Sequence, residues 1–357
     1  MQLLMAGHRQ TSRIKEPDQM NHVSPIRRHS DPVVVETRHV VACVDRSEQA
    51  AKVVSHAIAI GEALAAPVTV LQVLETGPGA ITRHDPVDWD LRRREARALL
   101  DDLVRSQPNM ANVAGIQLAT GPVADAIVRF VDQNRENLLV LGTRGTDELG
   151  RHCISGTVHD VLEHTPDSFL LVPADAATSP PSYRRIVVPL DGSPWAESAV
   201  PLAVRLALAG DAELVLAHVV PTPELTESRP LEATDLELRQ RIIERNELAA
   251  HDYLERLRRQ LRARNVAARI LLKRGDNARR TLVRIVSAED ADLVVISARG
   301  HGNCRHADVR YGSTASYLMT NAQVPVLVSR PRMPTASAEA ALIASPRPMR
   351  MPGSMQA

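Results

Sequence analysis

The chain has 357 residues, with 43 lysines and arginines against 42 aspartates and glutamates and a formal net charge of +1. Its length favours two domains of ordinary size, and its balanced charge gives no indication of nucleic acid or an anionic membrane as a partner. Hydrophobic residues make up 44% of the chain but aromatic residues only 2%, so we expect a folded core of alanine, valine, leucine and isoleucine.

Cysteine usage and the first residues bear on the cellular compartment. Cys43, Cys153 and Cys304 lie far apart and show neither a CxxC motif nor the Cys/His spacing of zinc sites, which fits a reducing environment. The apolar run at 3–6 is too short for the core of a signal peptide, and no segment approaches the ~18 apolar residues of a membrane span. The sequence therefore predicts a cytoplasmic protein.

Composition divides the chain into five parts. Residues 1–36 mix proline, histidine, arginine and glutamine without periodicity, and residues 332–357 are rich in proline, alanine and methionine, so both are predicted to be disordered tails. A stretch rich in proline, serine and threonine at 175–183 is typical of a linker. We therefore predict two domains, at 37–174 and 184–331.

The two predicted domains are copies of one unit. VVACVDRSEQA resembles IVVPLDGSPWA and pairs Asp45 with Asp191, 146 positions later. LLVLGTRG resembles LVVISARG, and ISGTVHDVLEH resembles RYGSTASYLMT, which pairs Gly156 with Gly312, 156 positions later. Because the offset changes so little along the unit, an internal duplication explains the pattern better than chance.

Each unit alternates strands with helices in the same order. The first is expected to contain a strand at 40–44, a helix at 48–64, a strand at 68–74, an amphipathic helix at 89–105, a third strand, a short helix, a fourth strand, a glycine loop, a last helix and a fifth strand ending near Val172. The matching elements of the second begin with a strand at 186–190, a helix at 196–209, a strand at 214–220 and a helix at 236–262, and its last strand ends near Val328.

This alternation decides the fold class. Apolar strands that alternate with helices indicate a parallel sheet covered on both faces. An Asp-x-Ser motif after the first strand of each unit is expected to cap the helix that follows. We therefore predict an α/β protein of two tandem doubly wound domains, each a five-stranded parallel sheet with helices on both faces.

The glycine loop of each unit follows the fourth strand. In doubly wound sheets, ligands bind outside the carboxyl ends of the strands where the strand order reverses, so Asp45, Val73 and this loop should converge. Glycines let the backbone approach a ligand closely, and a helix that begins at Gly156–Thr157 offers its positive end and a hydroxyl. The loop therefore suits phosphate, although it is not the GxxxxGK[ST] loop, and a lone GxxG motif is equally compatible with simple tight turns.

The two copies together resemble the universal stress protein family in its tandem, two-domain form. The family's hallmark is G-x2-G-x9-G-[ST] after the fourth strand, with an aspartate at the end of the first strand. The resemblance covers residues 37–331. The matching residues are Asp45, Gly142, Gly145, Gly156 and Thr157 in the first unit, and Asp191, Gly300, Gly312 and Ser313 in the second, where Ser297 replaces the leading glycine.

The resemblance implies an adenine nucleotide alpha hydrolase-like fold and a site for ATP, with Mg²⁺ arriving together with the nucleotide. The first-strand aspartates and the second-strand residues Val73 and Val219 would face the adenosine. Gly145, Gly156 and Thr157, with their counterparts Gly300, Gly312 and Ser313, would face the phosphates, and Ser297 would add a small side chain near the ribose. Both loops are longer than the hallmark, with ten residues between Gly145 and Gly156 and eleven between Gly300 and Gly312. We expect these extra residues to bulge outward.

Arg144 and Arg299 occupy matching positions in the two loops. A guanidinium there could reach a phosphate with two hydrogen bonds, or it could simply be solvated on an exposed loop. The histidines near the loops do not align between the units, so no dedicated metal site is expected.

Three functions are compatible with these patterns. The first is an ATP-binding stress-response protein that acts through nucleotide-dependent signalling or protein partners. The second is a nucleotide-free dimerisation or interaction module of the same fold. The third is an adenylate-transferring enzyme, but no second cluster of lysines, histidines or paired carboxylates matches between the units, so at most slow ATP hydrolysis is expected. The apolar last strands, at 169–172 and 324–328, are expected to pair within the chain, with a homodimer as a further alternative.

Overall fold

The computed structural model describes residues 37–75, 86–133, 136–146, 152–176, 181–223, 232–301 and 311–330. Both predicted tails and the middle of the predicted linker lie outside these residues.

The first unit follows the predicted order of strands and helices. Its elements are β1 (His39–Val44), α1 (Ala50–Leu64), β2 (Val68–Leu74), α2 (Pro86–Arg105), the 3-10 helix η1 (Met110–Asn112), β3 (Val113–Thr120), α3 (Val123–Gln133), β4 (Asn137–Gly142), β5 (Arg144–Thr146), β6 (His152–Cys153), α4 (Gly156–His164) and β7 (Ser168–Val172). The short strands β5 and β6 pair antiparallel with each other. The glycine loop of this unit thus contains a small ribbon that the sequence did not predict.

The second unit repeats this order. Its elements are β8 (Arg185–Pro189), α5 (Pro194–Glu197), α6 (Val200–Gly210), β9 (Glu213–Pro221), α7 (Ala233–Arg262), β10 (Ala268–Gly275), α8 (Ala278–Ala288), β11 (Leu293–Ser297), α9 (Ser313–Asn321) and β12 (Val326–Ser329). The predicted helix at 196–209 is divided into α5 and α6, because Pro201 has no amide hydrogen to bond to the carbonyl of Glu197.

The Asp-x-Ser motifs do not act alike in the two units. In the second unit, Ser193 is the N-cap of α5 and accepts a hydrogen bond from the N–H of Ala196 at 3.1 Å, as predicted. In the first unit the prediction is wrong: α1 begins later, at Ala50, and its N-cap Gln49 makes no side-chain cap. There Ser47 bonds back to the carboxylate of Asp45 and ends the strand in a turn instead.

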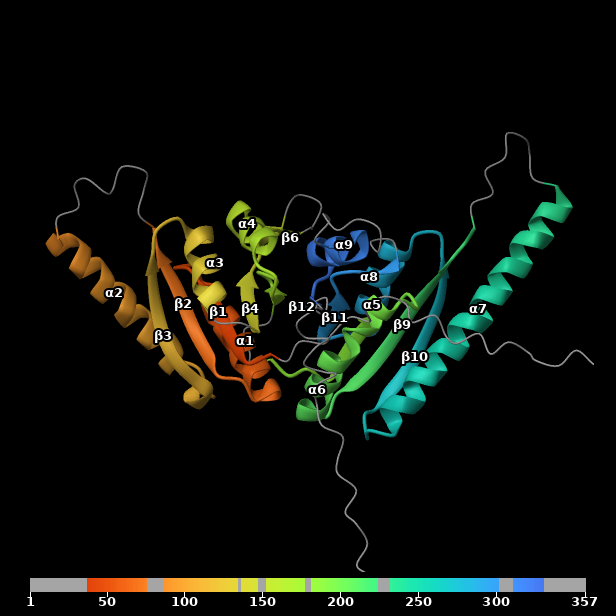
Figure 1. The fold of residues 1–357 in the computed structure, drawn as a ribbon, viewed down its shortest axis with the longest axis horizontal. Helices are drawn as coiled ribbons and strands as arrows, with labels where there is room; N and C mark the ends of the chain where they lie inside the picture. Colours follow the sequence, from red (N-terminus) through yellow and green to blue (C-terminus); the bar gives the residue numbers. More distant parts are fainter. Residues whose placement is uncertain are drawn as a thin grey trace, which may run out of the picture.

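Ten strands form one continuous sheet in the order β10-β9-β8-β11-β12-β7-β4-β1-β2-β3 (Figure 1). Within each unit all neighbouring strands are parallel, and the units join where β12 runs antiparallel to β7, with Leu327 opposite Leu170. The strand order reverses between β1 and β4 and again between β8 and β11. Each unit is therefore a doubly wound α/β domain with a possible ligand crevice at the carboxyl ends of these strands.

Helices cover both faces of the sheet and bury two apolar cores. α1, α2, α6 and α7 pack over one core, and α3, α4, α8 and α9 pack over the other. Side chains along β2 alternate between the two: Val68 and Val70 belong to the first core, whereas Leu71 and Val73 belong to the second. This alternation shows on which side of the sheet a residue near the carboxyl edge lies.

The outer helices α2 and α7 lie at the two far ends of the sheet (Figure 1). α7 has 30 residues and buries a stripe formed by Ile243, Ala250, Leu254, Leu257 and Leu261, while most of its other residues are polar and exposed. None of the helices in the described part of the chain is both long and apolar enough to cross a membrane.

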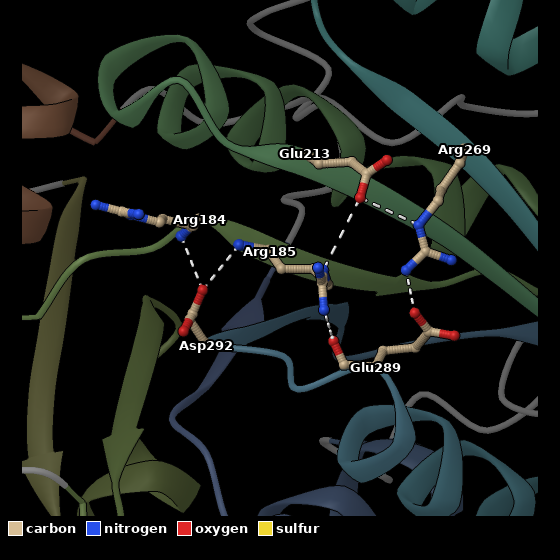
Figure 2. A network of polar contacts seen from close by, with 6 residues as sticks. All are labelled: Arg184, Arg185, Glu213, Arg269, Glu289 and Asp292. Carbon is tan, nitrogen blue, oxygen red and sulfur yellow. Dashed lines mark hydrogen bonds and ion pairs between the residues drawn. The ribbon is translucent and has the colours of Figure 1, made fainter.

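A polar network closes the amino end of the second unit's sheet (Figure 2). It joins Arg184, Arg185, Glu213, Arg269, Glu289 and Asp292. One carboxylate oxygen of Asp292 accepts hydrogen bonds from the N–H groups of Arg184 and Arg185, at 2.8 Å each. Arg269 donates to Glu213 at 3.1 Å and pairs with Glu289 at the end of α8. Because this network lies at the edge opposite to the carboxyl ends of the strands, we assign it a structural role.

Arg330, directly after β12, ties the second unit to the first. Its guanidinium donates hydrogen bonds to the carbonyls of Leu162, at 2.7 Å, and Thr165, both at the carboxyl end of α4. The guanidinium carbon lies 5.1 Å from the ring centroids of both Phe169 and Tyr311, and the residue is only 9% exposed. A buried cation from one unit thus satisfies terminal helix carbonyls of the other.

A second contact between the units lies where α1 packs against α6. The Nδ1 atom of His56 in α1 lies 2.7 Å from the hydroxyl of Tyr183, just before β8. Burial lowers the pKa of His56 to about 4 and raises the pKa of Tyr183 above its ordinary value. Arg205 of α6 donates to the carbonyl of Leu64 at the end of α1.

Candidate functional site

The second unit has a cavity of about 500 Å³ at the carboxyl ends of its strands. The six residues predicted for this unit all line it: Asp191, Val219, Ser297, Gly300, Gly312 and Ser313. Leu282 of α8 and Ile296 of β11 add apolar surface. The fold therefore brings the predicted residues together at the point where the strand order reverses.

The carboxylate of Asp191 is held in place by the backbone around it. Its Oδ1 atom accepts hydrogen bonds from the N–H and the hydroxyl of Ser193, at 2.9 and 2.6 Å. Its Oδ2 atom accepts one from the N–H of His301 at 2.7 Å. A Cβ atom on Gly300 would lie 2.5 Å from Oδ2, so only glycine permits this approach. The glycine that the sequence analysis placed near the phosphates thus has a second role, which is to admit the chain's own carboxylate to the loop.

Replacing Gly300 with alanine is expected to lower the free energy of unfolding by about 1–2 kcal/mol, because the added methyl group displaces Asp191 and breaks its charge-assisted hydrogen bond to His301. Urea unfolding followed by circular dichroism measures the change. Gly156→Ala is the matched control, since a Cβ atom there would meet nothing within 4 Å and alanine favours the helix. Equal stability of the two variants would contradict the role assigned to Gly300.

The amino terminus of α9 opens onto the same cavity. Its N-cap, Gly312, has no side chain to bond the first amides, and the N–H of Gly312 itself donates to the carbonyl of Ala298 at 2.7 Å. Ser313, Thr314 and Ala315 in the first turn all line the cavity. Uncapped amides at the positive end of a helix favour an anion.

Arg299 and Ser297 shape the loop from the other side. The guanidinium carbon of Arg299 lies 5.3 Å from the centroid of the Trp195 ring. This cation–π contact holds the side chain against α5, so Arg299 is not simply solvated on an exposed loop. Ser297 is only 4% exposed, and its hydroxyl accepts a hydrogen bond from the N–H of Arg299 at 3.3 Å. The serine that replaces a glycine here therefore stabilises the turn.

His218 is a cavity residue that the sequence analysis missed. It lines the cavity beside Val219, and its Nδ1 atom lies 2.7 Å from the carbonyl of Leu190. Its counterpart in the first unit is Gln72, which also lines a cavity. The sequence offered one signal for these residues: each directly precedes a valine that was predicted to line the site, and each is polar.

The first unit has a larger cavity, of about 1360 Å³. Of the predicted residues, Asp45, Val73, Gly142 and Thr157 line it. Gly145 lies in β5 and Gly156 is the first residue of α4, and neither is among the described lining residues. The fold thus gathers four of the six predicted residues around one cavity and places the other two in the loop and helix beside it.

Two contacts in this cavity differ from those of the second unit. A Cβ atom on Gly142 would lie 2.7 Å from the side chain of Gln49, which donates to the carbonyl of Val172 at 2.8 Å, so Gly142 makes room for a protein side chain. Ser155 caps α4 by accepting a hydrogen bond from the N–H of Val158 at 3.2 Å. One amide at the start of α4 is therefore already satisfied, unlike those of α9.

The first cavity also has walls that the sequence analysis did not predict. Trp89, Arg92 and Glu95 of α2 line it, and so does Lys52 of α1, whose ammonium donates to the carbonyl of Ala174 at 2.7 Å. These positions carry no motif, and only the packing of α2 against β3 and α1 reveals them.

The described residues of the two cavities include no metal centre. Within the described ranges, no group of three or more histidine, cysteine, aspartate or glutamate residues is arranged to hold a metal ion. Cys43 lines the first cavity, but burial raises its pKa to about 12, so it stays a neutral thiol.

Comparison with known proteins gives one family. The model of the universal stress protein family matches residues 36–173 and 182–330. Among solved structures, a universal stress protein from Archaeoglobus fulgidus DSM 4304 is similar, with 17% identity, a TM-score of 0.58, and coverage of 82% of this chain and 98% of that one. A functionally unknown protein from Pseudomonas aeruginosa PAO1 is similar at 13% identity and a TM-score of 0.57, with coverage of 83% and 93%. At these identities the structural likeness shows the fold alone. No curated protein matched the chain.

Proposed function

The chain belongs to the universal stress protein family, and we propose on that premise that it binds ATP in one or both crevices and acts in a cytoplasmic stress response through nucleotide-dependent signalling or protein partners. The observation that carries this proposal is the second cavity, where Asp191, Val219 and the uncapped start of α9 meet at the reversal of strand order.

The second cavity has suitable surfaces for each part of a nucleotide. Val219 and Leu282 would contact the base, because both are apolar residues that line the cavity. The first-turn amides of α9, with the hydroxyls of Ser313 and Thr314, would hold phosphate oxygens. Mg²⁺ would enter bound to the phosphates and neutralise part of their charge. In this arrangement Asp191 is the group that would reach the ribose or the base edge.

The first cavity would bind the same ligand with different support. Val73, on the α3/α4 side of the sheet, takes the place of Val219, and Thr157 takes that of Ser313. Ser155 already bonds one amide of α4, so fewer amides are available to phosphates there. Arg46, Lys52 and Arg92 in the lining would contact phosphate oxygens instead, and Mg²⁺ would offset the four carboxylates that also line this cavity.

Calorimetric titration with ATP and Mg²⁺ tests the proposal. We expect the parent chain to show saturable binding at up to two sites. Val73→Phe and Val219→Phe each add bulk to one cavity, so each should abolish binding in its own unit only, and the double variant should not bind ATP. Leu208→Phe, on the exposed face of α6, is the control. An absence of saturable binding by the parent would refute the proposal.

A nucleotide-free interaction module is the second candidate. It is favoured by one observation, the hydrogen bond from the N–H of His301 to the carboxylate of Asp191. Because this loop amide already bonds to the protein, it is not available to a phosphate. Under this alternative the parent would neither bind ATP nor purify with nucleotide. Under both candidates the protein works through partners, so a rate of ATP hydrolysis above about one per second would contradict both.

A further inference from the structure

The first turn of α8 lies at the rim of the second cavity. Ala278, the first residue of α8, and Leu282, about one turn later, both line this cavity. α8 also packs beside α9 (Figure 1), whose first turn is assigned above to phosphate oxygens. Arg279 and Arg280 directly follow Ala278, and both are exposed. The helix therefore brings two guanidinium groups to the rim of the cavity.

Arginines are disfavoured at this end of a helix. The positive end of the helix dipole repels cations and favours carboxylates. At the matching positions in the first turn of α3, the first unit has Ala124 and Asp125. Among the described residues no carboxylate pairs with Arg279 or Arg280, including Asp276 just before the N-cap of α8. A bound anion would offset the repulsion that the protein itself leaves in place.

Arg279 is oriented by α9. Its guanidinium carbon lies 5.9 Å from the centroid of the Tyr317 ring, and Ser316, the residue before Tyr317, lines the cavity. A guanidinium that lies over a ring keeps the N–H groups at its edge free to donate hydrogen bonds. The first unit has Val161 in place of Tyr317 and Ala124 in place of Arg279, so it carries neither member of this pair. The pair places a preorganised donor beside the start of α9 in the second unit.

The exposure of Arg279 decides which phosphate it meets. Ser313 and Thr314 line the cavity at the start of α9, so the amides and hydroxyls there meet the phosphates that lie inside it. Arg279 is exposed and is not one of the described lining residues. It therefore meets the part of a ligand that extends to the rim, which in a nucleotide is the last phosphate of the chain.

We propose that Arg279 is a specificity-determining residue of the second unit, which binds the terminal phosphate of ATP and makes this unit prefer ATP to ADP and AMP. This rests on the proposed function, because the base and the other phosphates occupy the cavity as described above. Arg280, which has no such contact with a ring, adds positive charge at the rim.

The test uses the full chain carrying Val73→Phe, which leaves only the second cavity open, and titrates it calorimetrically with ATP, ADP and AMP in excess Mg²⁺. We expect ATP to bind about tenfold more tightly than ADP, as for one additional charge-assisted hydrogen bond. Arg279→Ala in the same chain should weaken ATP binding by about tenfold and leave AMP affinity unchanged, which also shows that the variant is folded. Arg279→Lys should keep part of the preference, since an ammonium is still a cation.

Arg284→Ala provides the matched control. Arg284 is also an exposed arginine of α8, but it lies more than one turn further along the helix from the rim. This variant should keep the whole preference for ATP.

The outcomes separate the two proposals. If ATP binds no more tightly than ADP, if Arg279→Ala keeps the preference, or if it weakens AMP as much as ATP, the role of Arg279 is overturned while nucleotide binding stands. If none of the three nucleotides binds, the proposed function fails for this unit, and the role of Arg279 fails with it.

Discussion

Replacing Arg330 with alanine is expected to lower the free energy of unfolding by about 3 kcal/mol, because the side chain is buried and its hydrogen bonds carry a charge. The variant would leave the carbonyls of Leu162 and Thr165 without their donor at the end of α4 and would open a space between the rings of Phe169 and Tyr311. Urea unfolding measures the loss. Because the contact joins the two units, limited proteolysis should also separate the two units of the variant faster than those of the parent.

Arg279 provides the matched control for this variant. Its guanidinium also lies over a tyrosine ring, 5.9 Å from the centroid of Tyr317, but it is exposed on α8. Arg279→Ala should therefore cost at most about 1 kcal/mol. Arg330→Lys should give an intermediate loss, since an ammonium keeps the charge but not the planar fork that reaches two carbonyls. If Arg330→Ala is no less stable than Arg279→Ala, the joining role of Arg330 is wrong.

Acidification is expected to destabilise the protein through His56. Burial lowers the pKa of His56 in the folded state from 6.5 to about 4. Above pH 6.5 both states are neutral and this residue costs nothing, whereas between pH 6.5 and 4 the unfolded state binds a proton that the folded state does not. Stability should therefore fall across that window as the pH is lowered, by up to about 3 kcal/mol from this one group.

The contribution of His56 is isolated by comparing the parent with His56→Gln at pH 7.5 and pH 4.5. Glutamine can still bond to the hydroxyl of Tyr183 but does not titrate, so the variant should lose about 2–3 kcal/mol less stability than the parent over this range. Carboxylates titrate in both proteins and cancel in the comparison. His251→Gln, exposed on α7, should behave like the parent. Parallel pH profiles for the parent and His56→Gln would contradict the assignment.

The fold class could be predicted from the sequence because it depends on regular patterns. The duplicated order of apolar strands and amphipathic helices specified two doubly wound units, and the topology confirms this with five parallel strands in each. The first two strands, as predicted at 40–44 and 68–74, differ from β1 and β2 by at most one residue. Periodicity identifies such elements because burial on both faces leaves little choice of residue.

Details that depend on single contacts could not be predicted. The division of α5 from α6 follows from one proline whose effect on a helix depends on its exact position. The sequence placed Asp191 and Gly300 in one site, but the close approach of the carboxylate to the glycine arises only in the folded chain. The same holds for Trp89, which lines the first cavity because α2 packs against β3 and α1. These features arise from contacts between residues far apart in the chain, which no local pattern records.

The antiparallel pairing of β7 with β12 has a consequence for how the two halves could diverge. Identical subunits that meet across a two-fold axis must present the same residues on both sides. Fusion into one polypeptide removes that symmetry requirement, and the halves have specialised: the first-unit counterparts of Tyr311 and Arg330 are Ser155 and Ala174. Tyr311 packs against the facing half, while Ser155 covers an amide of its own helix. The differences at these two pairs of positions thus make the junction asymmetric, and they also make the two cavities different, because Tyr311 lines one cavity and Ser155 and Ala174 line the other.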